Sequence, residues 1–154
     1  MDENEAMTPR HRPSYTHNYT PLNRESSEIR LFSFQQGIDG KIAGQHHIFP
    51  ISRCPGFIAL SYTWGTPGSE TIISLDGNDI SIHQNLNEAL ISIIRSRARP
   101  SPLQDLLYNK AAYCQYFWID SICIDRQDLL ERNHQVGLMK SIYSNADFVI
   151  TWLG

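Results

Sequence analysis

The chain has 154 residues, with 13 Lys and Arg against 16 Asp and Glu, so its formal net charge is −3 at pH 7. This balance provides no basic surface for nucleic acid, and we expect no nucleic-acid partner. Every apolar run falls short of the roughly 18 residues that a membrane-spanning helix needs, and the N-terminus has no signal-peptide core. Three cysteines are too few for a disulfide framework, which favours a reducing compartment and a cytoplasmic protein.

The first 28 residues differ in composition from the rest of the chain. They contain Pro9, Pro13 and Pro21 among Arg, His, Ser, Thr and Asn, with little apolar periodicity. A segment of this composition buries too little apolar surface to offset the entropy lost on ordering. We therefore predict a disordered N-terminal tail over residues 1–28 and a single folded domain over residues 29–154.

The first half of that domain has mainly strand patterns. Alternating apolar residues predict a strand over 29–34, and a second, short one is predicted over 47–51. Residues 57–64 are apolar on both parities up to Leu60, which is typical of a central strand covered on both faces. Two further runs, 71–75 and 79–82, flank Asp76-Gly77-Asn78 and predict a β-hairpin appended to the sheet.

A helix is predicted to follow the hairpin. Asn85 and Glu88 have the spacing of a capping box at its start. The apolar residues that recur at helical spacing are Leu86, Ala89, Leu90, Ile93 and Ile94. The helix ends in an Arg-rich run before Pro100, where cations suit the helix C-terminus. Pro102 then stands at the first position of a second, shorter helix that is predicted to begin at residue 101.

Residues 117–150 have the pattern of a strand, a helix and another strand. An apolar run over 117–119 stops at Asp120, and residues 148–150 are dense in β-formers. Between them, Val136, Met139 and Tyr143 fall on one helical face. Such a unit joins parallel strands by a right-handed crossover, so we expect its two strands to be parallel neighbours. Ligands of open α/β sheets bind outside the carboxyl ends of the strands, which places Asp120 at the candidate site.

Three sequence blocks closely resemble the fungal heterokaryon-incompatibility (HET) domain family. They are Ala59-Leu60-Ser61-Tyr62-x-Trp64-Gly65, then Asn85-Leu86-x-x-Ala89-Leu90, and then a long block with Trp118-Ile119-Asp120-x-Ile122-Cys123-Ile124, Glu131-Arg132-x-x-Gln135-Val136, Met139, Ile142-Tyr143, Ala146 and Trp152-Leu153-Gly154. The resemblance extends from residue 29 to the end. Where the family usually reads Cys-Ile-Asn-Gln, this chain has Asp125 and Arg126 in the last two positions. Family members usually continue past the Trp-Leu-Gly sequence, so we expect the domain to be truncated at its C-terminus.

The resemblance implies a fold and two functions. HET domains are remotely similar to Toll/interleukin-receptor (TIR) domains, which implies a flavodoxin-like α/β domain with a central, mostly parallel sheet flanked by helices. In the first function, the domain associates with itself or with another death-signalling protein, and thereby triggers cell death in fungal non-self recognition. In the second, it cleaves the nicotinamide–ribose bond of NAD, as some TIR domains do. No cofactor is required in either case, and NAD is a substrate in the second.

Two carboxylates are the candidate catalytic groups for NAD cleavage, which passes through an oxocarbenium-like state that a carboxylate stabilises. We assign this role to Glu131 and Asp120. Each has a structural alternative. Glu131 fits the capping-box register after Asp128, and Asp120 can accept hydrogen bonds from the amides of its own turn.

Tyr62, Trp64, Gly65 and Asp125 are the candidate residues for binding NAD. Tyr62 and Trp64 are two residues apart and so face the same side of their strand, where their rings either stack on a flat ligand or fill the core. The chain has no Gly-rich dinucleotide fingerprint, so a redox use of NAD is disfavoured.

Cysteine and histidine residues offer weaker signals. Cys123 lies between two isoleucines, which favours a buried structural thiol over a nucleophile activated by His134. His46 and His47 are adjacent and point to opposite faces of a strand, and no Cys/His pair stands nearby at zinc spacing. The sequence therefore predicts no metal site.

Overall fold

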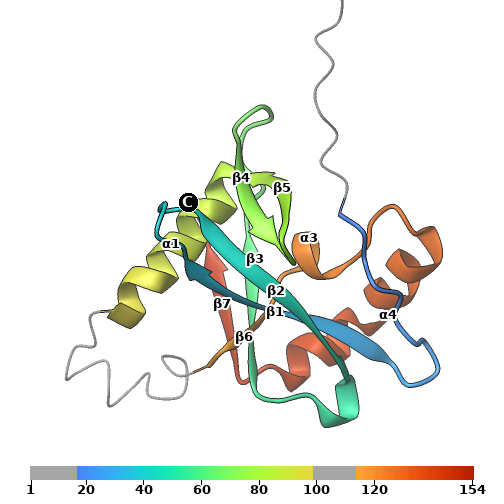
Figure 1. The fold of residues 1–154 in the computed structure, drawn as a ribbon. Coiled ribbons are helices and arrows are strands. Elements are labelled where there is room, and N and C mark those ends of the chain that lie inside the picture. The colour runs from blue at the N-terminus through green and yellow to red at the C-terminus, as the bar shows by residue number, and fades with distance from the viewer. Residues whose placement is uncertain (1–16, 99–113) are drawn as a thin grey trace, which may run out of the picture.

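The computed structural model of the chain describes residues 17–98 and 114–154. Figure 1 shows the ribbon of this part of the chain. Its elements are β1 (Glu28–Gln36), β2 (Ile42–Pro50), the short 3-10 helix η1 (Ile51–Arg53), β3 (Phe57–Tyr62), β4 (Glu70–Leu75), β5 (Asn78–His83), α1 (Gln84–Ala98), β6 (Tyr116–Trp118), α3 (Asp120–Cys123), α4 (Leu129–Asn145) and β7 (Phe148–Trp152). The α/β class expected from the sequence is confirmed.

Within the described residues, seven strands form one mixed sheet in the order β5-β4-β2-β1-β6-β3-β7. The pairs β2–β4, β3–β6 and β3–β7 are parallel, whereas β1–β2, β1–β6 and β4–β5 are antiparallel. The expected mostly parallel, flavodoxin-like sheet is therefore wrong. The loops after β1 and β4 are too short for a crossover, so in each case the chain returns antiparallel to the strand it has just left.

The strands on either side of α4 run in the same direction, but they are not neighbours. β3 lies between β6 and β7, so Ala59 pairs with Trp118 on one side and with Val149 on the other. The expectation that these two strands pair directly is thus wrong. Phe57, Ile58, Ala59 and Leu60 are at most 1% exposed, which confirms β3 as a central strand and explains why it occupies the interior position.

The β4–β5 hairpin is confirmed, and it extends the sheet beyond β2. Leu75 pairs with Asn78 around a two-residue turn of Asp76 and Gly77. These two residues have φ values of 50° and 79°. A turn with positive φ at both central positions follows the natural twist of a hairpin and is favoured by an Asp-Gly pair.

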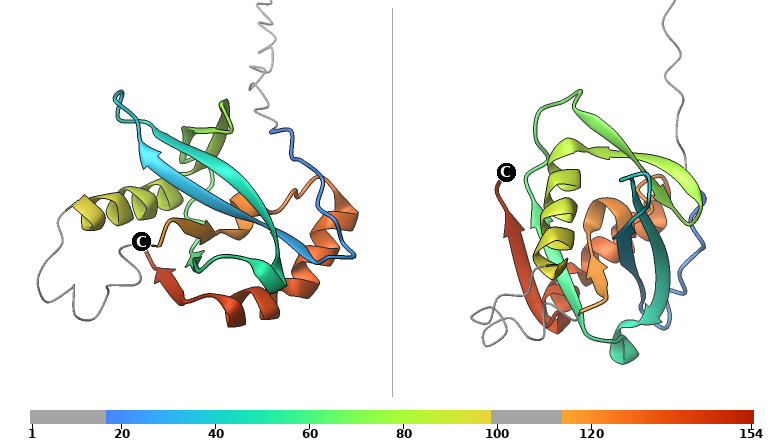
Figure 2. Two further views of the ribbon diagram at one scale, coloured as in Figure 1. Left: turned by 60° about the horizontal axis from the view of Figure 1, so that its bottom comes forward. Right: turned by 60° about the vertical axis from the view of Figure 1, so that its left-hand side comes forward.

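Helices cover both faces of the sheet at β6. Phe117 and Trp118 are adjacent and fully buried, so they point to opposite faces. The Arg97 guanidinium from α1 lies 5.0 Å from the centre of the Phe117 ring, whereas Tyr143 from α4 packs edge-on to Trp118 at 5.5 Å. Figure 2 shows α1 and α4 on different sides of the strands.

The two long helices begin differently from each other. Asp128 caps α4 as predicted, because its side chain accepts from the amides of Leu130 and Glu131 at 2.9 and 3.1 Å. The predicted capping box of α1 is wrong, since that helix begins one residue earlier, at Gln84. The Asn85 amide instead bonds to the Thr63 carbonyl and to the Trp152 indole N–H, so tertiary partners occupy it.

The buried face of α4 also differs from the expected one. Val136 is 55% exposed, while Glu131, Gln135 and Ile142 are buried. Gln135 Nε2 donates to the Glu28 carbonyl at 2.9 Å. Polar contacts of this kind to β1 fix the rotation of the helix and turn Val136 toward solvent.

Part of the segment that the sequence analysis assigns to the tail lies against the domain. The Tyr19 hydroxyl donates to the Ile122 carbonyl at 3.1 Å, and the Thr20 carbonyl accepts from Arg30. The contacts of the folded domain therefore begin before Glu28. The remainder of the predicted tail and the helix predicted to begin at residue 101 lie outside the described residues. Among the helices of the described part, none is long and apolar enough to cross a membrane.

Candidate functional site

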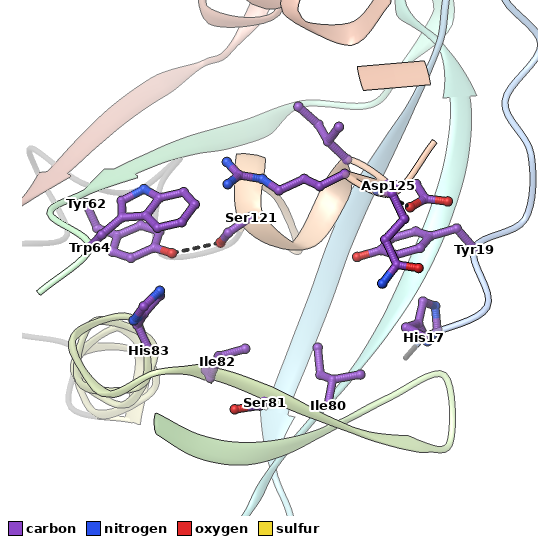
Figure 3. A pocket seen from close by; sticks show the side chains of 13 residues that line it. His17, Tyr19, Tyr62, Trp64, Ile80, Ser81, Ile82, His83, Ser121 and Asp125 are labelled. Atoms are coloured by element: carbon purple, nitrogen blue, oxygen red, sulfur yellow. Dashed lines mark hydrogen bonds between the residues drawn. The ribbon is translucent and has the colours of Figure 1, made fainter. Parts of the chain in front are cut away.

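A pocket of about 260 Å³ lies between β5, the segment that follows α3, and the N-terminal segment. In Figure 3, Tyr62, Trp64 and His83 lie at one end of it, and His17, Tyr19 and Asp125 at the other. Ile80 and Ile82 of β5 form an apolar wall between the two ends. The volume is just below the usual range of sites for drug-sized ligands, so the pocket can enclose part of a dinucleotide and not a whole one.

Tyr62 and Trp64 lie on the same side of the chain at the end of β3, as predicted. Their rings are parallel within 5°, with centres 6.5 Å apart. Tyr62 is 8% exposed and its hydroxyl donates to Ser121 Oγ at 2.9 Å, whereas Trp64 is 43% exposed. Burial raises the pKa of Tyr62, so its hydroxyl stays protonated as a donor. Tyr62 therefore belongs to the core, and Trp64 borders the pocket with a partly exposed ring.

Arg126 connects Trp64 to Asp120. Its guanidinium carbon lies 4.2 Å from the centre of the Trp64 ring, and its Nη2 donates to Asp120 Oδ2 at 3.2 Å. Asp120 Oδ1 accepts from the Ser121 amide at 2.7 Å, which is the turn-stabilising contact considered from the sequence. Arg126 lines the pocket and Asp120 does not. Asp120 thus affects the pocket by holding the Arg126 side chain in place.

Asp125 lines the pocket, whereas Gly65 does not. Asp125 Oδ1 accepts from the Gln127 amide at 3.0 Å, and this bond shapes the loop before α4. Gly65 has a φ of 75° and borders a separate depression beside Asn85. The structure therefore brings Tyr62, Trp64 and Asp125 together and leaves Gly65 on another surface.

Glu131 is buried in an ion pair with Arg30 of β1. The two side chains are 8% and 1% exposed, and both carboxylate oxygens accept from the guanidinium, with 2.9 Å between Oε2 and Nη2. Glu131 Oε1 also accepts from the Asp125 amide at 2.8 Å. Glu131 does not line the pocket, nor does it return a capping-box bond to Asp128. Its carboxylate joins α4 to β1 and to the loop before α4.

Arg30 holds several further groups in place around this pair. Its guanidinium donates to the carbonyls of Cys123 and Thr20, and it lies 4.8 Å from the centre of the Tyr19 ring. Cys123 is fully buried, and this burial raises the pKa of its thiol to about 12. A thiol with that pKa is unreactive at neutral pH, in agreement with the structural role predicted for it.

His46 and His47 point to opposite sides of β2, as predicted. His47 Nε2 lies 2.8 Å from Ser33 Oγ. His46 lies on the other side, with Nδ1 at 3.1 Å from Asp76 Oδ2 and Nε2 at 3.0 Å from the Ile122 carbonyl oxygen. Burial lowers the pKa of His46 to about 4, so the imidazole is neutral at neutral pH.

Several pocket residues were not identified from the sequence. Arg126 could have been found from the sequence, because it stands where the family usually has Gln. His17 and Tyr19 carried none, since they stand in a Pro-rich and polar stretch with no periodicity. Ile80 and Ile82 were predicted as hairpin residues, and nothing in their spacing indicates that they face a pocket.

Comparison with known proteins identifies the family. The family model described as heterokaryon incompatibility protein (HET) matches residues 57–154, which is well over half of the chain. Heterokaryon incompatibility protein 6, OR allele, of Neurospora crassa is 38% identical over 109 residues. That match covers 68% of this chain and 15% of the relative, so the chain spans a small part of the relative's length. No solved structure gives a significant match. The chain belongs to the heterokaryon incompatibility (HET) family.

Proposed function

We propose that this domain is a signalling module of fungal non-self recognition that acts in the cytoplasm and triggers cell death by associating with further copies of itself. Its family membership and the name of the Neurospora relative support the incompatibility role. Self-association rests on one observation about α4. Leu129, Leu130 and Val136 are 58%, 62% and 55% exposed on that helix.

The spacing of these three side chains places them on one face of α4. At 3.6 residues per turn they fall within about a third of the helix circumference. Apolar residues gathered on one exposed face often mark a site of protein association. The buried pair of Glu131 with Arg30 fixes the rotation of α4, so this face is held toward solvent.

The test is the state of association of the purified chain, measured by light scattering over a range of concentrations. Wild-type protein is expected to form dimers or larger species, and Val136→Glu to shift them toward monomer. Gln35→Glu is the control, because it adds the same charge at an exposed position of β1 rather than on α4. A wild-type protein that stays monomeric at every concentration, or equal behaviour of the two variants, contradicts self-association through this face. Expression of the same variants in fungal cells then links association to cell death.

The alternative function is hydrolysis of NAD in the pocket. The observation that favours it is the exposed Trp64 ring, which together with Arg126 and Asp125 borders a pocket large enough for a nicotinamide–ribose unit. A flat nicotinamide ring stacks well on an indole. Asp125 is the carboxylate that lines this pocket, and it replaces Glu131 and Asp120 as the group to test for stabilising the ribosyl cation.

Nicotinamide release from NAD tests this alternative. Asp125→Asn is expected to lower the rate by about 10²–10³, as is common for the loss of one electrostatic contact to a transition state. Asp79→Asn is the control, because Asp79 is an exposed hairpin carboxylate that does not line the pocket. If the wild-type protein releases no nicotinamide in its associated state, the enzymatic function is ruled out.

A further inference from the structure

Two histidines and one aspartate converge from three distant parts of the chain. His17 comes from the N-terminal segment, His46 from β2, and Asp76 from the turn between β4 and β5. Asp76 Oδ2 lies 3.1 Å from His46 Nδ1 and 3.3 Å from His17 Nε2. All three atoms lie within 4.8 Å of one another. The His17 and His46 side chains are 4% and 8% exposed, and that of Asp76 is 34% exposed.

Hydrogen bonding orients the His46 ring toward Asp76. Its Nε2 faces the Ile122 carbonyl oxygen at 3.0 Å, and a carbonyl only accepts, so Nε2 carries a proton. Nδ1, on the other side of the ring, is thereby directed at Asp76 Oδ2.

We propose that His17 Nε2, His46 Nδ1 and Asp76 Oδ2 bind a divalent transition-metal ion, with Zn²⁺ as the best match. Two imidazole nitrogens and one carboxylate oxygen are a common ligand set for zinc, and a fourth position stays open for water or another ligand. Tetrahedral ligands at zinc–nitrogen and zinc–oxygen distances of about 2.0–2.1 Å stand roughly 3.3 Å apart. The two separations from Asp76 agree with that spacing.

The groups behind the ligands are those of a built metal site. The Ile122 carbonyl accepts from His46 Nε2 and so directs Nδ1 to the metal, which is the usual arrangement for a metal-bound histidine. Asp76 Oδ1 accepts from the His46 backbone amide at 2.9 Å, so the carboxylate is oriented with Oδ2 toward the two histidines. The His17 ring packs edge-on against Tyr19 at 4.7 Å. Metal binding requires a small rotation of His17, which lies on the N-terminal segment.

The metal would connect that segment to the sheet at the rim of the pocket. His17 and Tyr19 both line the pocket, and Asp76 closes the hairpin whose strand β5 forms the apolar wall. Binding one ion would therefore hold the two sides of the pocket together. It would also stabilise the folded chain, because the unfolded chain does not hold the three ligands close to one another.

Zinc titration of the full chain tests the proposal, after chelation has removed bound metal. We expect one equivalent of Zn²⁺ to bind, by calorimetry and by elemental analysis of the dialysed protein. At a free Zn²⁺ concentration of a hundred times Kd, the Tm should rise by about 5–10 °C. Mg²⁺ is expected to give no shift, because it prefers oxygen ligands.

Variants identify the ligands. His17→Gln, His46→Gln and Asp76→Asn should each lower the Zn²⁺ affinity more than tenfold. Asn suits position 76, because it tolerates the positive φ found there. His47→Gln and Asp79→Asn are the controls, since they change the neighbouring histidine on the opposite side of β2 and the next carboxylate of the hairpin. Both should bind Zn²⁺ as the wild type does.

Three outcomes overturn the proposal. One is a wild-type chain that retains less than a tenth of an equivalent after dialysis against excess Zn²⁺. Another is an equal loss of binding in the control variants and in the ligand variants. The third is a wild-type chain whose Tm does not change when Zn²⁺ is added. Measuring the Tm of each metal-free variant separates lost binding from lost folding.

Discussion

Two Arg–carboxylate pairs in this domain have similar chemistry and different surroundings. The Arg30–Glu131 side chains are 1% and 8% exposed and join β1 to α4, which are about a hundred residues apart in the chain. The Arg126–Asp120 side chains are 43% and 27% exposed and come from α3 and the loop after it, six residues apart beside the pocket. The first pair is part of the fold and has no free surface for a ligand. The second leaves its guanidinium stacked on Trp64, where a ligand can displace it.

The largest expected effect comes from breaking the buried pair. Glu131→Gln leaves the Arg30 charge buried without its counter-ion, and a loss of about 3–5 kcal/mol in the free energy of unfolding is typical of such a change. Urea denaturation measures it. Replacing both partners together, as in Arg30→Met with Glu131→Leu, should cost less than the two single changes added, because no charge is then left unpaired. A loss below about 1 kcal/mol for Glu131→Gln would mean that the pair is not buried in solution.

A smaller effect is expected for Asp128, the carboxylate three residues before Glu131. Its side chain caps α4 through the Leu130 and Glu131 amides and is exposed. Asp128→Ala should therefore cost about 1 kcal/mol, the usual consequence of losing an N-cap. Asp128→Ser keeps an acceptor at the cap and should recover most of that loss in the same denaturation experiment. Equal stability of the Ala and Ser variants would contradict the capping role.

The exposed pair should contribute still less to stability. Asp120→Asn removes the charge that faces Arg126 and is expected to change the free energy of unfolding by less than about 1 kcal/mol, because solvent screens both groups. Thermal unfolding at low and high salt measures this change, and the small difference between wild type and variant should shrink as salt rises. A loss as large as that of Glu131→Gln would place Asp120 in the core of the fold.

The smallest effect should appear only at alkaline pH and concerns Tyr19, which lies over Arg30. Burial raises the pKa of Tyr19 from 10.0 to about 12, so the folded state holds this proton more tightly than the unfolded state does. The resulting stabilisation is present below pH 10 and is lost between pH 10 and about 12. Tyr19→Phe cannot ionise, so its stability should fall less steeply across that window.

Burial also raises the pKa of Cys123 from 9.0 to about 12, so its contribution is lost between pH 9 and about 12, an overlapping range. Cys123 is present in both proteins, so the difference between wild type and Tyr19→Phe isolates the tyrosine. Identical pH profiles for the two proteins would show that the Tyr19 hydroxyl is exposed to solvent.

Local sequence features accounted for many elements of the fold. The apolar run of β3 predicted a strand covered on both faces, and Asp76-Gly77 predicted the turn of the hairpin. Asp128 predicted the start of α4. The turn and the helix cap depend on interactions among residues close in the chain. A strand that is apolar on both faces is stable only where both faces are covered. The HET blocks likewise identified the family.

Long-range pairing decided what the sequence did not determine. The insertion of β3 between β6 and β7, and the antiparallel pairing of β1 with β6, depend on which apolar surfaces fit together across the whole sheet. Val136 was predicted to be buried because periodicity gives an amphipathic face, but the contacts of Glu131 and Gln135 with β1 set the rotation of α4.

The candidate site shows the same division between sequence and tertiary structure. The sequence by itself named Trp64 and Asp125 as candidates, and both line the pocket. Tertiary structure decided that Glu131 is paired with Arg30 rather than directed at the pocket. It also decided that His17, His46 and Asp76 meet. These three residues are about thirty positions apart from one to the next, and no short spacing signals a metal site assembled from a terminal segment, a strand and a turn. Whether a charge is buried, and whether distant residues meet at one site, depends on three-dimensional packing and not on spacing in the sequence. Only the folded chain therefore determines both.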